Sequence, residues 1–215
     1  MLAAVLVAAN LSGCQIVMGV LQIAQGFPKN KCDFTSFTRK SLARDGKKVV
    51  ILVSSSGPAQ VEEPSLDINV IGEVSRKLKI ENIDVVDPHL VSAWIDDNGE
   101  ITKNTLLDPI GRHFHVDYII LITFENFGYR EENSQGLFRG HAEGKINVSE
   151  MVGRDWETKH AKVIYNKPFT CRYPGNQPVA ISPDEGPEVF KQRFLEKLST
   201  TLSWTFYDHR LEDEI

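Results

Sequence analysis

The sequence predicts an α+β protein with a mixed β-sheet of about five strands covered by helices. Apolar, β-branched runs at 47–55 and 116–129 are typical of strands buried on both faces. Residues 65–82 instead have the periodicity of a helix, while 137–152 alternate apolar and polar side chains, as in an antiparallel strand with one buried face. The element order β-α-β-α-α-β-β-β-α therefore predicts helical connections first and an antiparallel meander in the second half.

The first half alternates predicted strands and helices. The strand at 47–55 lies between Gly46 and the breaker sequence SSSGP. The helix that follows carries one apolar stripe and begins after Ser65, a suitable N-cap residue. Its stripe consists of Leu66, Val70, Ile71, Val74 and Leu78. A second strand is expected at 83–87, followed by helices at 89–100 and 102–114, where Pro109 marks a break or a new first turn.

The second half begins with the central strand at 116–129, and the turn REENSQG then leads to the strand at 137–152. A further strand at 156–171 is expected to place Ala161, Val163, Tyr165 and Phe169 on one face. After a loop rich in proline and glycine, large apolar residues recur every four positions, which predicts a helix that packs on the sheet. These residues are Phe190, Phe194, Leu198, Leu202 and Phe206.

Composition narrows the class of protein. The chain has 215 residues, which is room for one domain, expected at 47–215, plus an N-terminal extension. The formal net charge is −5, whereas a nucleic-acid-binding protein needs a basic face, so no nucleic-acid partner is expected.

The N-terminal segment carries no charged side chain before Lys29. MLAAVLVAANLSGCQ has the apolar core of an export signal, and Leu11-Ser12-Gly13-Cys14 resembles the lipobox of bacterial lipoprotein signal peptides. The resemblance implies a signal peptide at 1–13, a lipidated N-terminus and tether at 14–46, and a diacylglyceryl group on the Cys14 thiol. Gln15 after the cysteine, rather than aspartate, implies delivery to the outer membrane, with the domain facing the periplasm.

The missing basic n-region departs from the signal-peptide pattern, and a start upstream of Met1 is the favoured explanation. Residues 1–27 are also long and apolar enough for an uncleaved single membrane span, which needs about 20 residues. A buried helix of the soluble domain is the third interpretation.

The order of elements and the stretch HVDYIIL, 115–121, resemble the periplasmic α/β domain shared by the TolB amino-terminal domain, the lipoprotein activators of penicillin-binding proteins and CsgG-like proteins. Those families commonly have a G-A-D-Y-V-L-like stretch, whereas this chain has His115-Val116 in place of Gly-Ala. The resemblance implies a non-catalytic protein that docks on envelope partners or assembles into envelope machines. A membrane pore is not expected, because one face of 137–152 is charged throughout.

Catalytic and metal sites have little support in the sequence. His113, His115 and Asp117 would point the same way in an extended segment, but they span a helix-to-strand junction and form no complete ligand set. VSSSGP lacks the remainder of a phosphate-binding loop. We therefore expect no metal, no cofactor and no catalytic site.

Cys32 and Cys171 form the one candidate disulfide once Cys14 is lipidated, and it would clip the tether to the last strand. The alternative is two separate buried thiols.

The expected function is that of a lipid-anchored, non-catalytic binding or assembly module with an envelope protein as its partner. The first alternative is an envelope hydrolase that uses His115 and Asp117. The second is a small-ligand binder that uses the aromatic-rich final helix.

Overall fold

The computed structural model describes residues 29–44, 46–55, 57–131, 134, 136–181 and 186–210. Cys32–Tyr207 form one compact unit. A second unit contains β1 (Lys29–Asn30) and β7 (His209–Arg210), which pair antiparallel. The predicted signal peptide at 1–13 and the predicted lipidation site Cys14 lie outside the described residues. Within the described ranges, no helix has the length and apolar character needed to cross a membrane.

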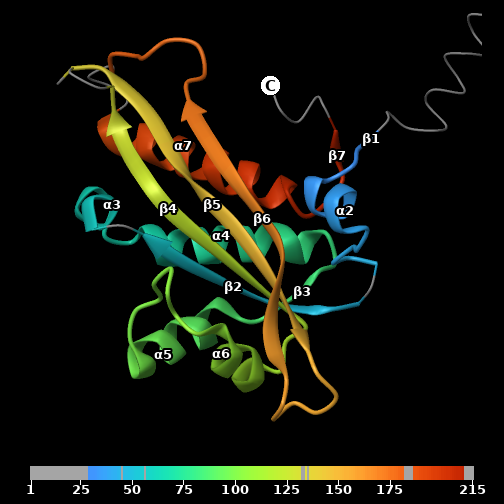
Figure 1. The fold of residues 1–215 in the computed structure, drawn as a ribbon. Coiled ribbons are helices and arrows are strands. Elements are labelled where there is room, and N and C mark those ends of the chain that lie inside the picture. Colours follow the sequence, from blue (N-terminus) through green and yellow to red (C-terminus); the bar gives the residue numbers. More distant parts are fainter. Residues whose placement is uncertain are drawn as a thin grey trace, which may run out of the picture. The chain divides into compact units, whose positions relative to one another are not determined.

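The larger unit is built on a five-stranded mixed sheet, which confirms the predicted α+β class (Figure 1). Its strands are β2 (Lys48–Ser55), β3 (Asp84–Val85), β4 (Tyr118–Arg130), β5 (Phe138–Val152) and β6 (His160–Tyr173). Their spatial order is β3-β2-β4-β5-β6. Strand β2 runs parallel to β3 and β4, and the β4-β5-β6 meander is antiparallel.

Helices cover both faces of the sheet. They are α2 (Asp33–Thr38), α3 (Gly57–Glu62), α4 (Leu66–Ile80), α5 (Pro88–Asn98), α6 (Leu107–Phe114) and α7 (Gly186–Trp204). Strand β3 lies on one side of β2 and β4 lies on the other, so the chain crosses the sheet in one direction from β2 to β3 and in the opposite direction from β3 to β4. Because both crossovers are right-handed, α4 lies on one face of the sheet, and α5 and α6 lie on the other. Figure 1 shows α4 and α7 behind the sheet, where all five residues of the predicted α7 stripe are buried.

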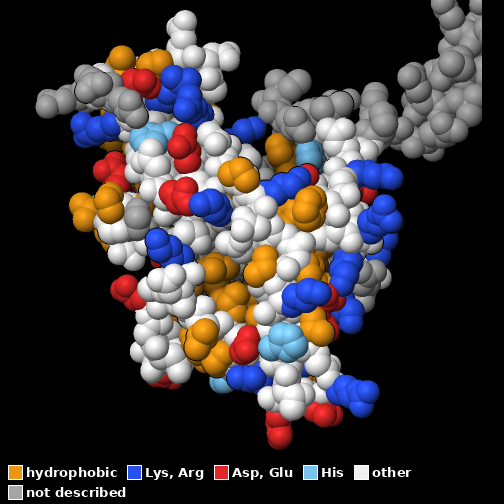
Figure 2. Space-filling view, viewed as in Figure 1, with side chains coloured by type: hydrophobic (Ala, Val, Ile, Leu, Met, Phe, Trp, Pro, Cys, Tyr) orange, Lys and Arg blue, Asp and Glu red, His pale blue; other side chains and the backbone are white. Residues whose placement is uncertain are grey.

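Strand β5 has the predicted alternation, and its glycines admit large neighbours. A Cβ at Gly140 would lie 2.4 Å from the Phe194 ring, and one at Gly144 would lie 2.0 Å from the Thr123 carbonyl oxygen. The opposite face of β5 carries charged and polar side chains, among them Lys145, which pairs with Glu125 at 2.7 Å. Figure 2 shows mixed positive and negative side chains across this side of the molecule.

The predicted face of the last strand is wrong at Ala161 and Val163, which lie on the opposite face from Tyr165 and Phe169. Tyr165 pairs with Val148, but Val163 pairs with Ser149, so one extra residue stands between them on β6. This β-bulge reverses the alternation, since neighbouring residues of β5 point to opposite faces. Tyr165 is consequently buried, whereas Val163 is 57% exposed.

The folded unit begins before the predicted boundary at residue 47, because α2 packs on the sheet. The ring centroid of Phe34 lies 5.7 Å from that of Tyr165 and 6.0 Å from that of Phe206, and Phe34 is fully buried. At the start of the same helix, Asp33 accepts hydrogen bonds from Tyr165 Oη at 2.5 Å and Lys167 Nζ at 2.7 Å. Burial opposes ionisation of Asp33, but these hydrogen bonds and the Lys167 charge outweigh it and lower the pKa of the carboxyl.

Candidate functional site

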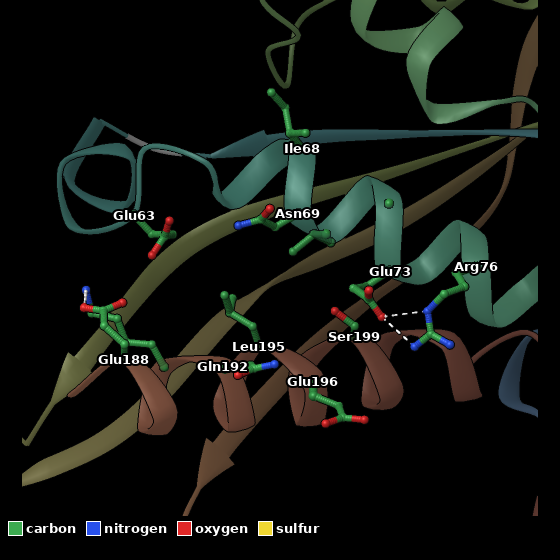
Figure 3. Close-up of a pocket in the computed structure, with 13 residues that line it drawn as sticks. Glu63, Ile68, Asn69, Glu73, Arg76, Glu188, Gln192, Leu195, Glu196 and Ser199 are labelled. Atoms are coloured by element: carbon green, nitrogen blue, oxygen red, sulfur yellow. Dashed lines mark hydrogen bonds and ion pairs between the residues drawn. The ribbon is translucent and has the colours of Figure 1, made fainter. Parts of the chain in front are cut away.

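A groove of about 710 Å³ runs between α4 and α7, on the face of the sheet that these two helices cover (Figure 3). Residue numbers rise in the same direction along both helices, and Figure 3 shows Glu73 and Ser199 facing one another across the groove. Val70 and Ser199 are buried in its floor. The apolar stripe of each helix faces the sheet, so the polar flanks of both helices form the walls. The remaining lining residues are Glu63, Ile68, Asn69, Gly72, Arg76, Glu188, Lys191, Gln192, Leu195 and Glu196.

The walls of the groove carry more negative than positive charge. The acidic residues are Glu63, Glu73, Glu188 and Glu196, and the basic ones are Arg76 and Lys191. Both cations have acidic partners, because Arg76 Nη2 lies 2.7 Å from Glu73 Oε2 and Lys191 Nζ lies 3.2 Å from Glu188 Oε1. Hydrogen bonding to Glu73, together with the charges of Glu73 and Glu196, raises the pKa of Arg76. The groove is therefore acidic, with Glu196 on its exposed rim.

A residue of the sheet holds a side chain at one end of the groove in place. Tyr129 of β4 is buried, and its Oη donates a hydrogen bond to Glu63 Oε2 at 2.9 Å. Lys191 Nζ lies 5.3 Å from the centroid of the Tyr129 ring. Burial, followed by the hydrogen bond and charge of Glu63, strongly raises the pKa of Tyr129. The phenol therefore stays protonated near neutral pH and donates its hydrogen bond to Glu63.

The three residues of the predicted helix-to-strand cluster are divided among different contacts. His113 lies on α6, and its ring centroid is 6.4 Å from that of Trp94. His115 ends α6, and its centroid is 5.0 Å from that of Trp156. Both histidines line a depression beside α5, but Asp117 does not.

Asp117 has a structural role at the start of β4. Its Oδ2 accepts a hydrogen bond from the Lys48 backbone N–H at 3.2 Å, and its Oδ1 lies 3.4 Å from Lys47 Nζ. The carboxylate thus joins β2 to β4. In the part of the chain that the structure describes, no group of three or more His, Cys, Asp or Glu side chains is placed to hold a metal ion.

The two described cysteines are buried thiols in separate surroundings. Cys32 Sγ contacts Thr35 Oγ1 at 3.0 Å, and Cys171 Sγ lies 3.9 Å from Thr201 Oγ1. Burial raises the pKa of the Cys171 thiol and keeps it protonated. The structure does not join the two residues, so the predicted disulfide between Cys32 and Cys171 is not formed in it.

Sequence reasoning missed the α4–α7 groove. Its walls come from two helices separated by about half of the chain, and nothing in either helix alone shows that they lie side by side. The only local signal was the polar flank beside each apolar stripe, and such flanks usually face solvent.

Comparison with known proteins assigns no family. No family model matches the sequence, and no curated protein matches it. Several solved structures are similar in fold at low sequence identity. Lipoprotein GNA1162 from Neisseria meningitidis is 10% identical with a TM-score of 0.45, over 68% of this chain and 92% of that one. A PelC dodecamer from Paraburkholderia phytofirmans is 10% identical with a TM-score of 0.45, over 84% and 96%. The hypothetical protein CT253 from Chlamydia trachomatis is 11% identical with a TM-score of 0.40, over 73% and 95%.

Proposed function

We propose that this chain is a lipid-anchored, non-catalytic binding module of a bacterial cell envelope, and that it docks a partner protein in the α4–α7 groove. The anchor is a lipid on Cys14, and the domain faces the periplasm at the outer membrane, as the lipobox-like sequence implies. Its place among TolB-like, activator-lipoprotein and CsgG-like domains is part of the same proposal.

The groove carries the proposal through its size and charge. Its volume of about 710 Å³ lies within the range typical of ligand-binding sites. The acidic excess along its walls suits a segment rich in lysine and arginine, and Leu195 offers apolar contact inside the groove. The partner is therefore expected to present a basic segment with at least one apolar side chain.

Site-specific photo-crosslinking tests the groove. A benzoylphenylalanine at Gln192, which is exposed on the groove wall, should crosslink a partner in intact cells, and the attached peptide should be rich in basic residues. The same probe at Asn166, exposed on β6, is the positional control and should give no such adduct.

Charge variants test the chemistry of the partner. Glu196→Lys should remove the Gln192 adduct, whereas Glu143→Lys, on the opposite face of the sheet, should leave it intact. An adduct that persists in Glu196→Lys, or that maps to an acidic segment, contradicts the proposal.

Substitution of the proposed lipidation site tests the anchor separately. Cys14→Ser should abolish incorporation of radiolabelled palmitate and move the chain from the membrane fraction to the soluble fraction. Full membrane retention would instead favour the uncleaved span.

A further inference from the structure

A second concave surface lies on the other side of the molecule, where α5 and α6 meet the beginning of β2. This depression encloses about 670 Å³. It shares no lining residue with the α4–α7 groove. Leu90, Ala93 and Trp94 form its α5 wall, and His113 and His115 form the opposite wall. Leu90 is 59% exposed, although it is a large apolar side chain.

Aromatic rings are concentrated around this depression. The Trp94 ring lies 6.4 Å from His113 and 6.5 Å from Phe114, measured between centroids. Beyond it, the His115 ring meets Trp156 at 5.0 Å, and Trp156 is partly exposed. Trp94 therefore lines the depression, and Trp156 lies next to it through its contact with His115.

Polar groups lie at the edge of the same surface. Asp97 and Asn98 follow Trp94 by about one helical turn, so they project from the same side of α5. Asn98 Nδ2 donates a hydrogen bond to the Trp94 carbonyl at 2.8 Å, which leaves its Oδ1 available as an acceptor. Both side chains are exposed, as are the imidazoles of His113 and His115, which can donate and accept.

His115 occupies a backbone position that normally selects glycine. Its φ is 50°, and it ends α6 in the left-handed conformation. The Val116 N–H bonds to the Gly111 carbonyl at 3.2 Å, which completes a helix C-terminal motif usually made with glycine at the position of His115. The chain thus places an exposed imidazole where glycine would cost less, and such departures concentrate at binding sites.

We propose that this depression binds a saccharide. One face of a pyranose ring carries C–H groups that pack on an aromatic ring such as Trp94, while its hydroxyls pair with carboxylate, amide and imidazole groups at the edge. Asp97, Asn98, His113 and His115 supply those groups around the ring. A lipid surface is a poorer fit, because the Asp97 carboxylate in the lining would face an anionic membrane.

Saturation-transfer NMR on the full-length chain, in a detergent without a sugar headgroup, tests this site. The probes are chitobiose, cellobiose, maltose and lactose. At least one should receive saturation on its ring protons, with a dissociation constant in the millimolar range. Absence of transfer to all four overturns the proposal.

His115→Gly separates binding from folding. Since glycine suits the left-handed position, the variant should melt at the same or a higher temperature, yet bind the disaccharide at least tenfold more weakly. His160→Ala removes an exposed histidine from β6 and should leave binding unchanged. Unchanged affinity in His115→Gly would place the sugar elsewhere and overturn the assignment.

Phospholipid vesicles test the alternative occupant, a lipid surface. Vesicles of phosphatidylethanolamine and phosphatidylglycerol are added to the full-length chain and to His115→Gly. Any change in Trp fluorescence that the vesicles cause should be the same in both proteins. A vesicle-induced change that His115→Gly abolishes, without sugar binding, would show a lipid-contacting surface and overturn the proposal.

Discussion

Two buried polar atoms lie near the end of β2 and the start of α4. Among the described residues, Ser55 Oγ and Asp67 Oδ1 have no hydrogen-bond partner of good geometry. Burial, with the charge of Glu100, raises the pKa of Asp67 above its ordinary value, and contacts with Ser55 offset only part of that rise. The folded state consequently holds the proton of Asp67 more tightly than the unfolded chain does.

Asp67→Asn should make the protein more stable at neutral pH than the natural chain. The unfolded carboxyl ionises near pH 3.8, whereas the folded one ionises only at a higher pH, so the stability of the natural chain falls as pH rises between these two values. Asparagine cannot ionise, so that loss should disappear. Chemical denaturation between pH 3 and pH 8 measures it.

The two proteins should show the same pH dependence below the lower pKa, where Asp67 is protonated in both states. Asp84→Asn, at an exposed position on β3, is a matched control that should leave the pH profile unchanged. A natural chain that becomes more stable relative to Asp67→Asn as pH rises through this window would contradict the reasoning.

The sequence predicted the roles of the individual residues just before β4 only in part. His113, His115 and Asp117 are close in sequence, and an extended backbone would have pointed them in one direction. The left-handed turn at His115 prevents that, so Asp117 reaches the Lys48 amide while the histidines meet different tryptophans. Such a turn is hard to predict where histidine stands in place of glycine.

Among the elements, α2 shows where local patterns fail. Its sequence DFTSFT is only six residues long, too short to display helical periodicity. The helix is held by tertiary contacts of Phe34 with Tyr118, Tyr165 and Phe206, which lie far along the chain. By contrast, the central strand β4 was predictable, because burial on both faces requires a continuous apolar run.

Phe34→Ala should lower the free energy of unfolding by about 3–5 kcal/mol, as expected for a fully buried phenylalanine. Phe37 provides a matched control, since it lies on the same helix but is 59% exposed. Phe37→Ala should cost less than ~1 kcal/mol. Denaturant titration of both variants measures the difference. Equal, small losses would show that α2 belongs to the tether, as its sequence suggested.

For the whole molecule, the way in which the strands pair can be predicted from the order of elements along the sequence. Short strands separated by helices predict parallel pairing, and two closely spaced strands after β4 predict an antiparallel meander. What no pattern shows is which helices become neighbours. The α4–α7 groove and the α5–α6 depression both depend on helix packing across the sheet, so neither could be located before the fold was known.

The mixed sheet ends in β6, a long edge strand that must avoid pairing with other copies. Helix α6 covers its beginning, where Asp108 Oδ1 accepts a hydrogen bond from the Ala161 N–H at 2.8 Å and Arg112 Nη1 donates to the Lys159 carbonyl at 3.1 Å. Farther along, Pro168 is exposed and offers no N–H. The other edge strand, β3, has only two residues.

Pro168→Val should therefore leave the fold intact but allow edge-to-edge association, because valine restores a backbone donor in the uncovered half of β6 and favours extended structure. Light scattering of the full-length chain should show a concentration-dependent rise in mass. Thr170→Val is the matched control, since it adds an apolar side chain two residues away on the same face without adding an N–H. If Thr170→Val associates as strongly, the added apolar surface causes the association. If neither variant associates, the bulge between Val163 and Tyr165 is enough to keep the edge from pairing.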